Sequence, residues 1–167
     1  MSVDNQNINT IQLKCFDGIY EYKVEHANFS ITKLDGNNIL TILIESNQDS
    51  LLPNDNEVKL EGFPTFEIQC ILTDEEVSKI GTLSKTIPEI GENPRGNFGN
   101  FYFFEHETPT NVTIDFSEVT DSSAKIALKL NVTDLNYYDG SKPLSEITVQ
   151  CIAKNCGDNK VSEWTEA

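Results

Sequence analysis

The chain has 167 residues and carries 27 acidic against 12 basic side chains, a net charge of -15 at pH 7. A chain so acidic repels nucleic acid and anionic membrane surfaces and attracts strongly basic molecules. No run of residues approaches the roughly 18 apolar residues of a membrane-spanning helix. At this length we expect a single domain over residues 1–167, with flexible polar ends formed by the first few residues and by 156–167.

The first third of the chain alternates apolar and polar residues, which is the pattern of half-buried β-strands. Residues 11–15 and 20–24 alternate on either side of a turn at Asp17-Gly18. The apolar positions then shift by one residue, and this change of phase predicts a β-bulge or a sharp bend near Glu25-His26. Asp35-Gly36 predicts a tight hairpin turn.

The middle of the chain contains the one helix that the sequence predicts. After a polar loop over 46–57 and a further strand, Thr73 and Glu76 have the spacing of a capping box. Acidic residues in the first turn favour the positive end of the helix dipole. We expect a short helix near 74–80 that ends at Gly81.

The rest of the chain again has the pattern of strands. Residues 84–100 hold two prolines and three glycines and predict a long irregular connection. Four strand patterns follow at 101–105, 112–116, 126–132 and 147–151. The sequence therefore predicts a mainly β fold, an antiparallel sandwich or a curled sheet or barrel of about eight or nine strands with one short helix.

Catalytic and metal-binding chemistry is restricted because the chain has only two histidines, His26 and His106. In Glu105-His106-Glu107, neighbouring side chains on a strand point to opposite faces, so three metal ligands would not converge. No Cys-x-x-Cys pair and no Gly-x-Ser-x-Gly motif is present. No pair of carboxylates stands out for glycoside hydrolysis. We therefore expect no enzymatic activity, no cofactor and no metal.

The cysteines and the start of the chain indicate a compartment. Cys15, Cys70 and Cys151 are in phase with apolar neighbours, which predicts buried free thiols. The N-terminal residues MSVDNQNINT include neither the basic nor the apolar segment of a secretion signal. The N-terminal residues predict a cytoplasmic protein, unless an export signal was removed before residue 1, and in a reducing cytosol the four cysteines are expected to be free thiols.

The acidic residues are unevenly spread along the chain. Between Arg95 and Lys125 there is no other lysine or arginine, and a second base-free run from Gly62 to Ser78 contains Glu67 and the acidic start of the helix. An exposed tyrosine beside an acid is a common interface anchor. The predicted partner-binding residues are Glu105, Glu107, Asp115, Glu118, Asp121 and Tyr138. The alternative is that the acidic residues only keep the protein soluble.

The whole-chain character, together with the stretch from FYFFEHETPTNVTIDF to NVTDLNYYDG, resembles bacterial immunity proteins of contact-dependent inhibition and polymorphic toxin systems. The resemblance implies a small acidic cytosolic protein that neutralises a toxin domain, frequently a basic nuclease. It assigns no functional residue. We expect a non-catalytic protein whose carboxylates take the place of phosphate and pair with the partner's lysines and arginines.

A β-sandwich that binds a carbohydrate or another small ligand is the second hypothesis. It predicts a concave pocket lined by aromatic side chains, with Phe98, Phe101, Tyr102 and Phe104 as its candidates. A hydrolase that uses two carboxylates in a cleft is the third.

Overall fold

The computed structural model describes residues 9–15, 18–47, 49–50, 52–53, 63–87, 98–103, 105–107, 109–132 and 145–156. The ends that we expected to be flexible lie almost wholly outside these residues, as does Tyr138. No helix among the described residues has both the length and the apolar character needed to cross a membrane.

The described chain is mostly β. Its elements are β1 (Thr10–Cys15), β2 (Gly18–Lys23), β3 (His26–Leu34), β4 (Asn37–Glu45), β5 (Thr65–Leu72), α1 (Asp74–Ser78), the 3-10 helix η2 (Ile80–Thr82), β6 (Ser84–Ile87), β7 (Phe98–Phe103), β8 (Glu105–Glu107), β9 (Thr110–Ser117), β10 (Ser123–Val132) and β11 (Ser145–Asn155). The predicted mainly β class with one short α-helix is confirmed. The described residues form eleven strands rather than eight or nine, because short edge strands such as β6 and β8 leave little periodic signal.

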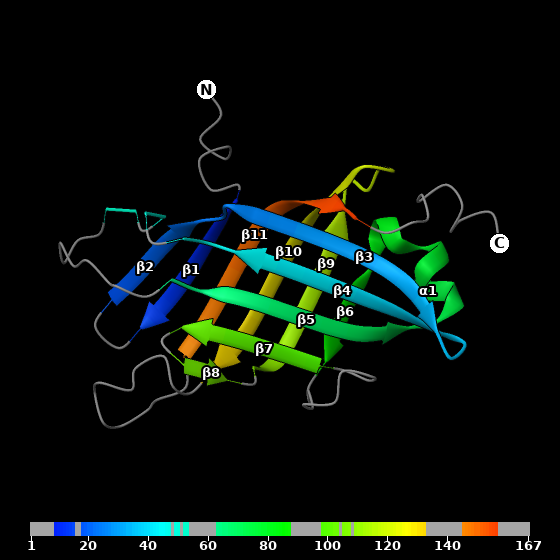
Figure 1. Cartoon of the computed structure of the whole chain (residues 1–167), viewed down its shortest axis with the longest axis horizontal. Helices are drawn as coiled ribbons and strands as arrows, with labels where there is room; N and C mark the ends of the chain where they lie inside the picture. Colours follow the sequence, from blue (N-terminus) through cyan, green and yellow to red (C-terminus); the bar gives the residue numbers. More distant parts are fainter. Residues whose placement is uncertain are drawn as a thin grey trace.

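The strands form one curled sheet in the order β6-β9-β10-β11-β3-β4-β5-β7-β8, and β1 and β2 continue from β11. Neighbouring strands of this sheet pair antiparallel except β11 and β3, which run parallel over Lys154–Asn28 and Asn155–Phe29. Figure 1 looks onto the layer β3-β4-β5-β7-β8, with β11, β10 and β9 crossing behind it. The short parallel contact is therefore the corner at which one layer continues into the other.

The predicted bend between the second and third strands is confirmed. Tyr20, Tyr22 and Val24 are buried in one phase, and Phe29 and Ile31 are buried in the next. The amide of Val24 donates to Asn9 O at 2.7 Å, whereas the amide of Glu25 donates to Glu45 O at 2.9 Å. Consecutive amides thus bind different layers, which is how a strand passes from one sheet to another.

The predicted hairpin turn is also confirmed. Asp35 has φ 53° and Gly36 has φ 81°, so both central residues lie in the left-handed region that a two-residue type I′ turn requires. The turn connects β3 and β4, which pair from Leu34–Asn37 to His26–Glu45.

One continuous hydrophobic core lies between the layers. Phe29 of β3 and Phe116 of β9 meet edge to face across it, with ring centroids 5.4 Å apart. Cys70 and Cys151 are free and buried, as predicted, and Cys156 is free and exposed. The side chain of Cys15 lies outside the described residues.

The helix has the predicted capping box. Thr73 Oγ1 accepts from the amide of Glu76 at 3.1 Å, and Glu76 Oε1 accepts from the amide of Thr73 at 2.9 Å. The α-helix nevertheless ends at Ser78, before Gly81, and Gly81 lies inside η2. The chain tightens there because the amide of Thr82 bonds Lys79 O, which lets Val77, Ile80 and Leu83 enter the core.

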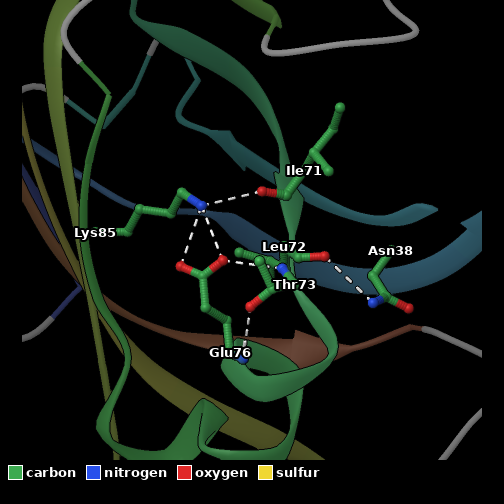
Figure 2. Close-up of polar contacts among 6 residues, drawn as sticks. All are labelled: Asn38, Ile71, Leu72, Thr73, Glu76 and Lys85. Carbon is green, nitrogen blue, oxygen red and sulfur yellow. Dashed lines mark hydrogen bonds and ion pairs between the residues drawn. The ribbon is translucent and has the colours of Figure 1, made fainter.

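A lysine connects the helix with both layers (Figure 2). Lys85 Nζ of β6 donates to both carboxylate oxygens of Glu76, at 3.0 and 3.1 Å, and to Ile71 O of β5 at 3.1 Å. Residues 84–100 are not wholly irregular, contrary to the prediction, because strand pairing forms at both of their ends. They begin with β6, which pairs with β9, and they end with the start of β7.

Candidate functional site

The two outer sides of the curled sheet differ in charge. We call the outer side of β3, β4, β5 and β7 the acidic face. Its described outward residues are His26, Asn28, Ser30, Thr32, Ile39, Thr41, Leu43, Glu45, Thr65, Glu67, Gln69, Ile71, Asn100 and Tyr102. In the described part of these strands, no lysine or arginine occupies an outward position. Lys33 belongs to the opposite phase, and its Nζ lies 4.0 Å from Asp74 at the end of the strand.

We call the outer side of β9, β10, β11, β1 and β2 the lysine face. Its described outward positions include the five lysines Lys14, Lys23, Lys125, Lys129 and Lys154 and the three acids Glu21, Asp115 and Glu146. The lysine face is therefore the more basic side of an acidic protein.

Three of the predicted partner-binding residues lie together at the end of β9. Asp115, Glu118 and Asp121 are all exposed. Asp115 is opposite Ala127 of β10, so Lys125 and Lys129 are its two diagonal neighbours, about 7–8 Å away. The run that is free of base along the chain is therefore not free of base in the folded sheet.

The turn that carries Glu118 and Asp121 is held by backbone and side-chain hydrogen bonds. Thr120 Oγ1 accepts from the amide of Ser123 at 3.1 Å, and the amide of Thr120 donates to Ser123 O at 2.8 Å. Asn155 of β11 donates from its amide to Ser122 O and from Nδ2 to Asp121 O. These bonds fix the backbone of the turn relative to β11.

Of the other three predicted residues, two have their backbone on another strand and one lies outside the described residues. Glu105 and Glu107 are on β8, where their backbones pair with Phe103 and Phe101, and their side chains lie outside the described residues. The eight-residue strand β9, about 23 Å long, separates them in the chain from Glu118. Tyr138 falls outside the described residues.

The acidic face holds a more compact group, which we call the acidic patch: Glu45, Glu67 and Tyr102. Glu45 is opposite Thr65 and Glu67 is opposite Leu43, so the two residues are diagonal neighbours across β4 and β5, with Cα atoms about 7–8 Å apart. Tyr102 of β7 is also opposite Thr65, because β7 pairs with the edge of β5 that does not pair with β4. Both carboxylates are half-buried, and 38% of Tyr102 is exposed.

A buried hydrogen-bond acceptor lies beside the acidic patch. Gln69 follows Glu67 by two residues on the same face of β5, and its Oε1 is buried without a hydrogen-bond partner in the described structure. An unsatisfied buried acceptor costs about 1–3 kcal/mol.

The aromatic pocket of the second hypothesis does not form as predicted. Phe101 is 2% exposed and its ring centroid lies 5.0 Å from that of Phe66 in the core, whereas Tyr102 is on the outer face. Neighbouring residues on a strand point to opposite faces, so these two side chains cannot line one pocket. The side chain of Phe98 and the whole of Phe104 lie outside the described residues.

The buried thiols are poor nucleophiles. Burial raises the pKa of Cys151 to about 12. Burial also raises the pKa of Cys70 to about 11, although nearby Lys85 acts in the opposite direction. Since the thiolate is the reactive form, both groups are inert at neutral pH. Within the described residues, no group of three His, Cys, Asp or Glu side chains is placed to hold a metal ion.

Comparison of the chain with protein-family models, with curated proteins and with solved structures gives no match. The site must therefore be argued from its own geometry. Sequence reasoning assigned Tyr102 to a pocket, and it missed the pairing of Glu45 with the strand that carries Glu67. Cross-strand register was the missing information, although the alternation of Phe101 and Tyr102 already places one aromatic side chain outward.

Proposed function

We propose that this chain is a non-catalytic binding protein that docks its acidic patch onto a basic partner and neutralises it, as the immunity proteins it resembles neutralise toxin domains. The observation that carries the proposal is the segregation of charge. The patch has two carboxylates and no outward lysine or arginine among its described strand neighbours, whereas five lysines lie on the lysine face.

The chemistry of the patch suits cationic side chains. Glu45 and Glu67 project from paired strands, so less conformational freedom is lost when they bind than for carboxylates on a loop. Hydrogen bonds from lysine or arginine to a carboxylate are charge-assisted and stronger than neutral ones. Tyr102 adds a large amphipathic side chain of the kind that anchors protein interfaces.

The net charge of -15 acts at longer range. A field of one sign can raise the association rate of an oppositely charged partner by about 10–10³-fold. Docking by the acidic face orients the five lysines of the lysine face away from the partner. Binding through Asp115, Glu118 and Asp121 would instead bring the partner's cations close to Lys125 and Lys129.

The experiment that tests the function uses the gene beside the one that encodes this chain. Its product is expressed alone and together with this chain in a bacterial host, and growth and co-purification at low salt are followed. We expect the product to be basic and toxic, and we expect the chain to bind it and restore growth. A chain that neither binds a basic protein encoded beside it nor alters its toxicity would refute the proposal.

A further inference from the structure

The lysine face contains a small polar hollow. Its volume is about 180 Å³, and it is lined by Thr10, Gln12, Glu21, Thr148 and Gln150 from β1, β2 and β11. Gln150 is exposed and the other four are half-buried. None of them belongs to the acidic patch or to the predicted partner-binding set.

Strand register brings these five side chains together. Gln12 of β1 is opposite Thr148 of β11 and opposite Glu21 of β2. Thr10, two residues before Gln12, is opposite Gln150. Thr148 Oγ1 donates to Gln12 Oε1 at 3.3 Å. The hollow is thus built on three hydrogen-bonded strands rather than on loops, which favours a fixed geometry.

Asn9 holds the end of the hollow. Its Oδ1 accepts from the amide of Ile152 on β11 at 2.8 Å, and its backbone O accepts from the amide of Val24 after β2 at 2.7 Å. Asn9 itself has φ 67°, a conformation that asparagine tolerates better than most residues. One residue therefore ties the start of β1 to both neighbouring strands.

Two apolar side chains flank the hollow on the same face. Ile19 precedes Glu21 by two residues on β2, and Ile152 follows Gln150 by two residues on β11. Their exposed fractions are 50% and 51%, and with Tyr102 they are the exposed large hydrophobic residues of the described chain. Exposed apolar groups beside converging polar groups are typical of ligand sites.

We propose that this hollow binds a neutral polyhydroxylated ligand, namely one sugar residue. Threonine hydroxyls and glutamine amides both donate and accept hydrogen bonds, as sugar hydroxyls do, and the Glu21 carboxylate accepts strongly from them. Ile19 and Ile152 lie beyond opposite ends of the hollow and are not part of its lining, so the five polar side chains carry the recognition. The hollow has the volume of about six liquid waters, which is the size of a single hexose.

The lining residues also disfavour an anionic ligand. They include a carboxylate and no lysine, and Lys129, which is opposite Thr148, already pairs with Glu146 at 3.4 Å. Lys23, which is opposite Thr10, and Lys14, which follows Gln12 by two residues on β1, lie at the rim but do not line the hollow. A phosphorylated sugar should therefore bind no better than the neutral one.

The test is a titration of the isotopically labelled full chain, followed by amide NMR. The probes are glucose, galactose, mannose, N-acetylglucosamine and glucose 6-phosphate. We expect at least one neutral sugar to shift the amides around residues 10–12, 21 and 148–152 with a dissociation constant of about a millimolar, as suits a ligand of this size. The proposal is overturned if none of the neutral sugars does so, or if the shifts fall elsewhere. A clear preference for glucose 6-phosphate would also overturn it, in favour of an anion site.

Two variants sharpen this test. Thr148→Val removes the hydroxyl and keeps the shape of the side chain, and we expect it to weaken sugar binding about tenfold. Thr113→Val is the matched control, because Thr113 is opposite Lys129 in the same row of the lysine face but outside the hollow. Equal weakening by both variants would contradict the assignment. The wild-type titration decides the proposal even if a variant does not fold.

Discussion

The acidic face and the lysine face cover the same core and are built from the same kind of strand, yet they carry different charges. On the acidic face, Glu45 and Glu67 lie on neighbouring strands with no outward lysine or arginine in the described part of that side. On the lysine face, Asp115 lies between Lys125 and Lys129. Charge in a β-protein is therefore distributed by the pairing of strands, and the order of charges along the chain does not reveal it.

The comparison also separates two kinds of recognition. The acidic patch is suited to long-range attraction of cations, with a tyrosine as its anchor. The hollow on the lysine face holds groups that bind neutral hydroxyls at short range. Since the two sites are on different faces, one can fail its test without affecting the other.

The largest expected effect concerns the core that holds the two faces together. Phe29→Ala removes a ring that is 1% exposed and contacts Phe116 of the opposite layer. We expect a loss of about 3–5 kcal/mol in the free energy of unfolding, measured by urea denaturation. In amide NMR spectra recorded at increasing urea concentration, the signals from both faces should disappear together if the layers form one cooperative unit.

Tyr102→Ala is the control for this variant, because it also removes an aromatic ring but from the surface of the acidic face. Its cost should stay below about 0.5 kcal/mol. Equal costs, or separate transitions for the two layers, would show that the faces do not share one core.

The next effect concerns binding. Glu45→Lys combined with Glu67→Lys should lower the affinity for the basic partner about a hundredfold and flatten the salt dependence of binding. The reason is that half-buried carboxylates are replaced by positive charges, which repel a basic partner. Asp115→Lys combined with Glu118→Lys changes the net charge equally and should lower affinity less than about tenfold. Titration of each double variant with the adjacent gene's product at low and high salt measures the affinity and its salt dependence. A larger loss of affinity in the Asp115 and Glu118 double variant would assign docking to the end of β9, as the sequence predicts.

The sequence predicts those features of the fold that depend on near neighbours. Alternation locates most strands, Asp35-Gly36 locates a turn whose positive φ angles suit these residues, and Thr73 with Glu76 locates the start of the helix. The shift of phase after Val24 even predicts the corner between the layers. In each case the signal lies within a few neighbouring residues of the sequence, although the corner itself is held by bonds to the more distant Asn9 and Glu45.

The features that escape prediction depend on contacts between distant segments. The parallel contact of Asn155 with Phe29 joins opposite ends of the chain. The strand β6 is short, and it forms where β9 offers a pairing edge. For the candidate site, the sequence places Glu67 in a base-free run, but only the register of β4 and β5 places Glu45 beside it.

A smaller effect concerns the lysine that connects the layers. Lys85→Met removes three hydrogen bonds, to Glu76 and to Ile71 O, from a side chain that is 24% exposed. We expect a loss of about 1–2 kcal/mol in the free energy of unfolding.

Lys129→Met is the control, because it breaks an ion pair of similar length, 3.4 Å, on the open surface of the lysine face, where 61% of the lysine side chain is exposed. Its cost in urea denaturation should be below about 0.5 kcal/mol, and a cost equal to that of Lys85→Met would contradict a role for Lys85 in joining the layers.

The smallest effect concerns the carboxylate that Lys85 contacts, and it depends on pH. Burial acts to raise the pKa of Glu76, but hydrogen bonds from Thr73 and Lys85 outweigh it and hold that pKa below its usual value of 4.5. A carboxyl group whose pKa is lower in the folded than in the unfolded chain stabilises the fold above the unfolded pKa, and this contribution is lost as the pH falls through the folded pKa. Glu76→Gln should therefore lower the free energy of unfolding by about 0.5–1 kcal/mol at pH 7. The difference in unfolding free energy between this variant and the unsubstituted chain should shrink as acid is added. Urea denaturation at a series of pH values from 7 downward measures this convergence.

Glu75→Gln, which affects the exposed 2.9 Å pair with Lys79 in the same helix, is the control, and its cost at pH 7 should be below about 0.5 kcal/mol. A difference for Glu76→Gln that stays constant with pH would show that the contact among Lys85, Glu76 and Thr73 joins the layers by packing rather than by charge.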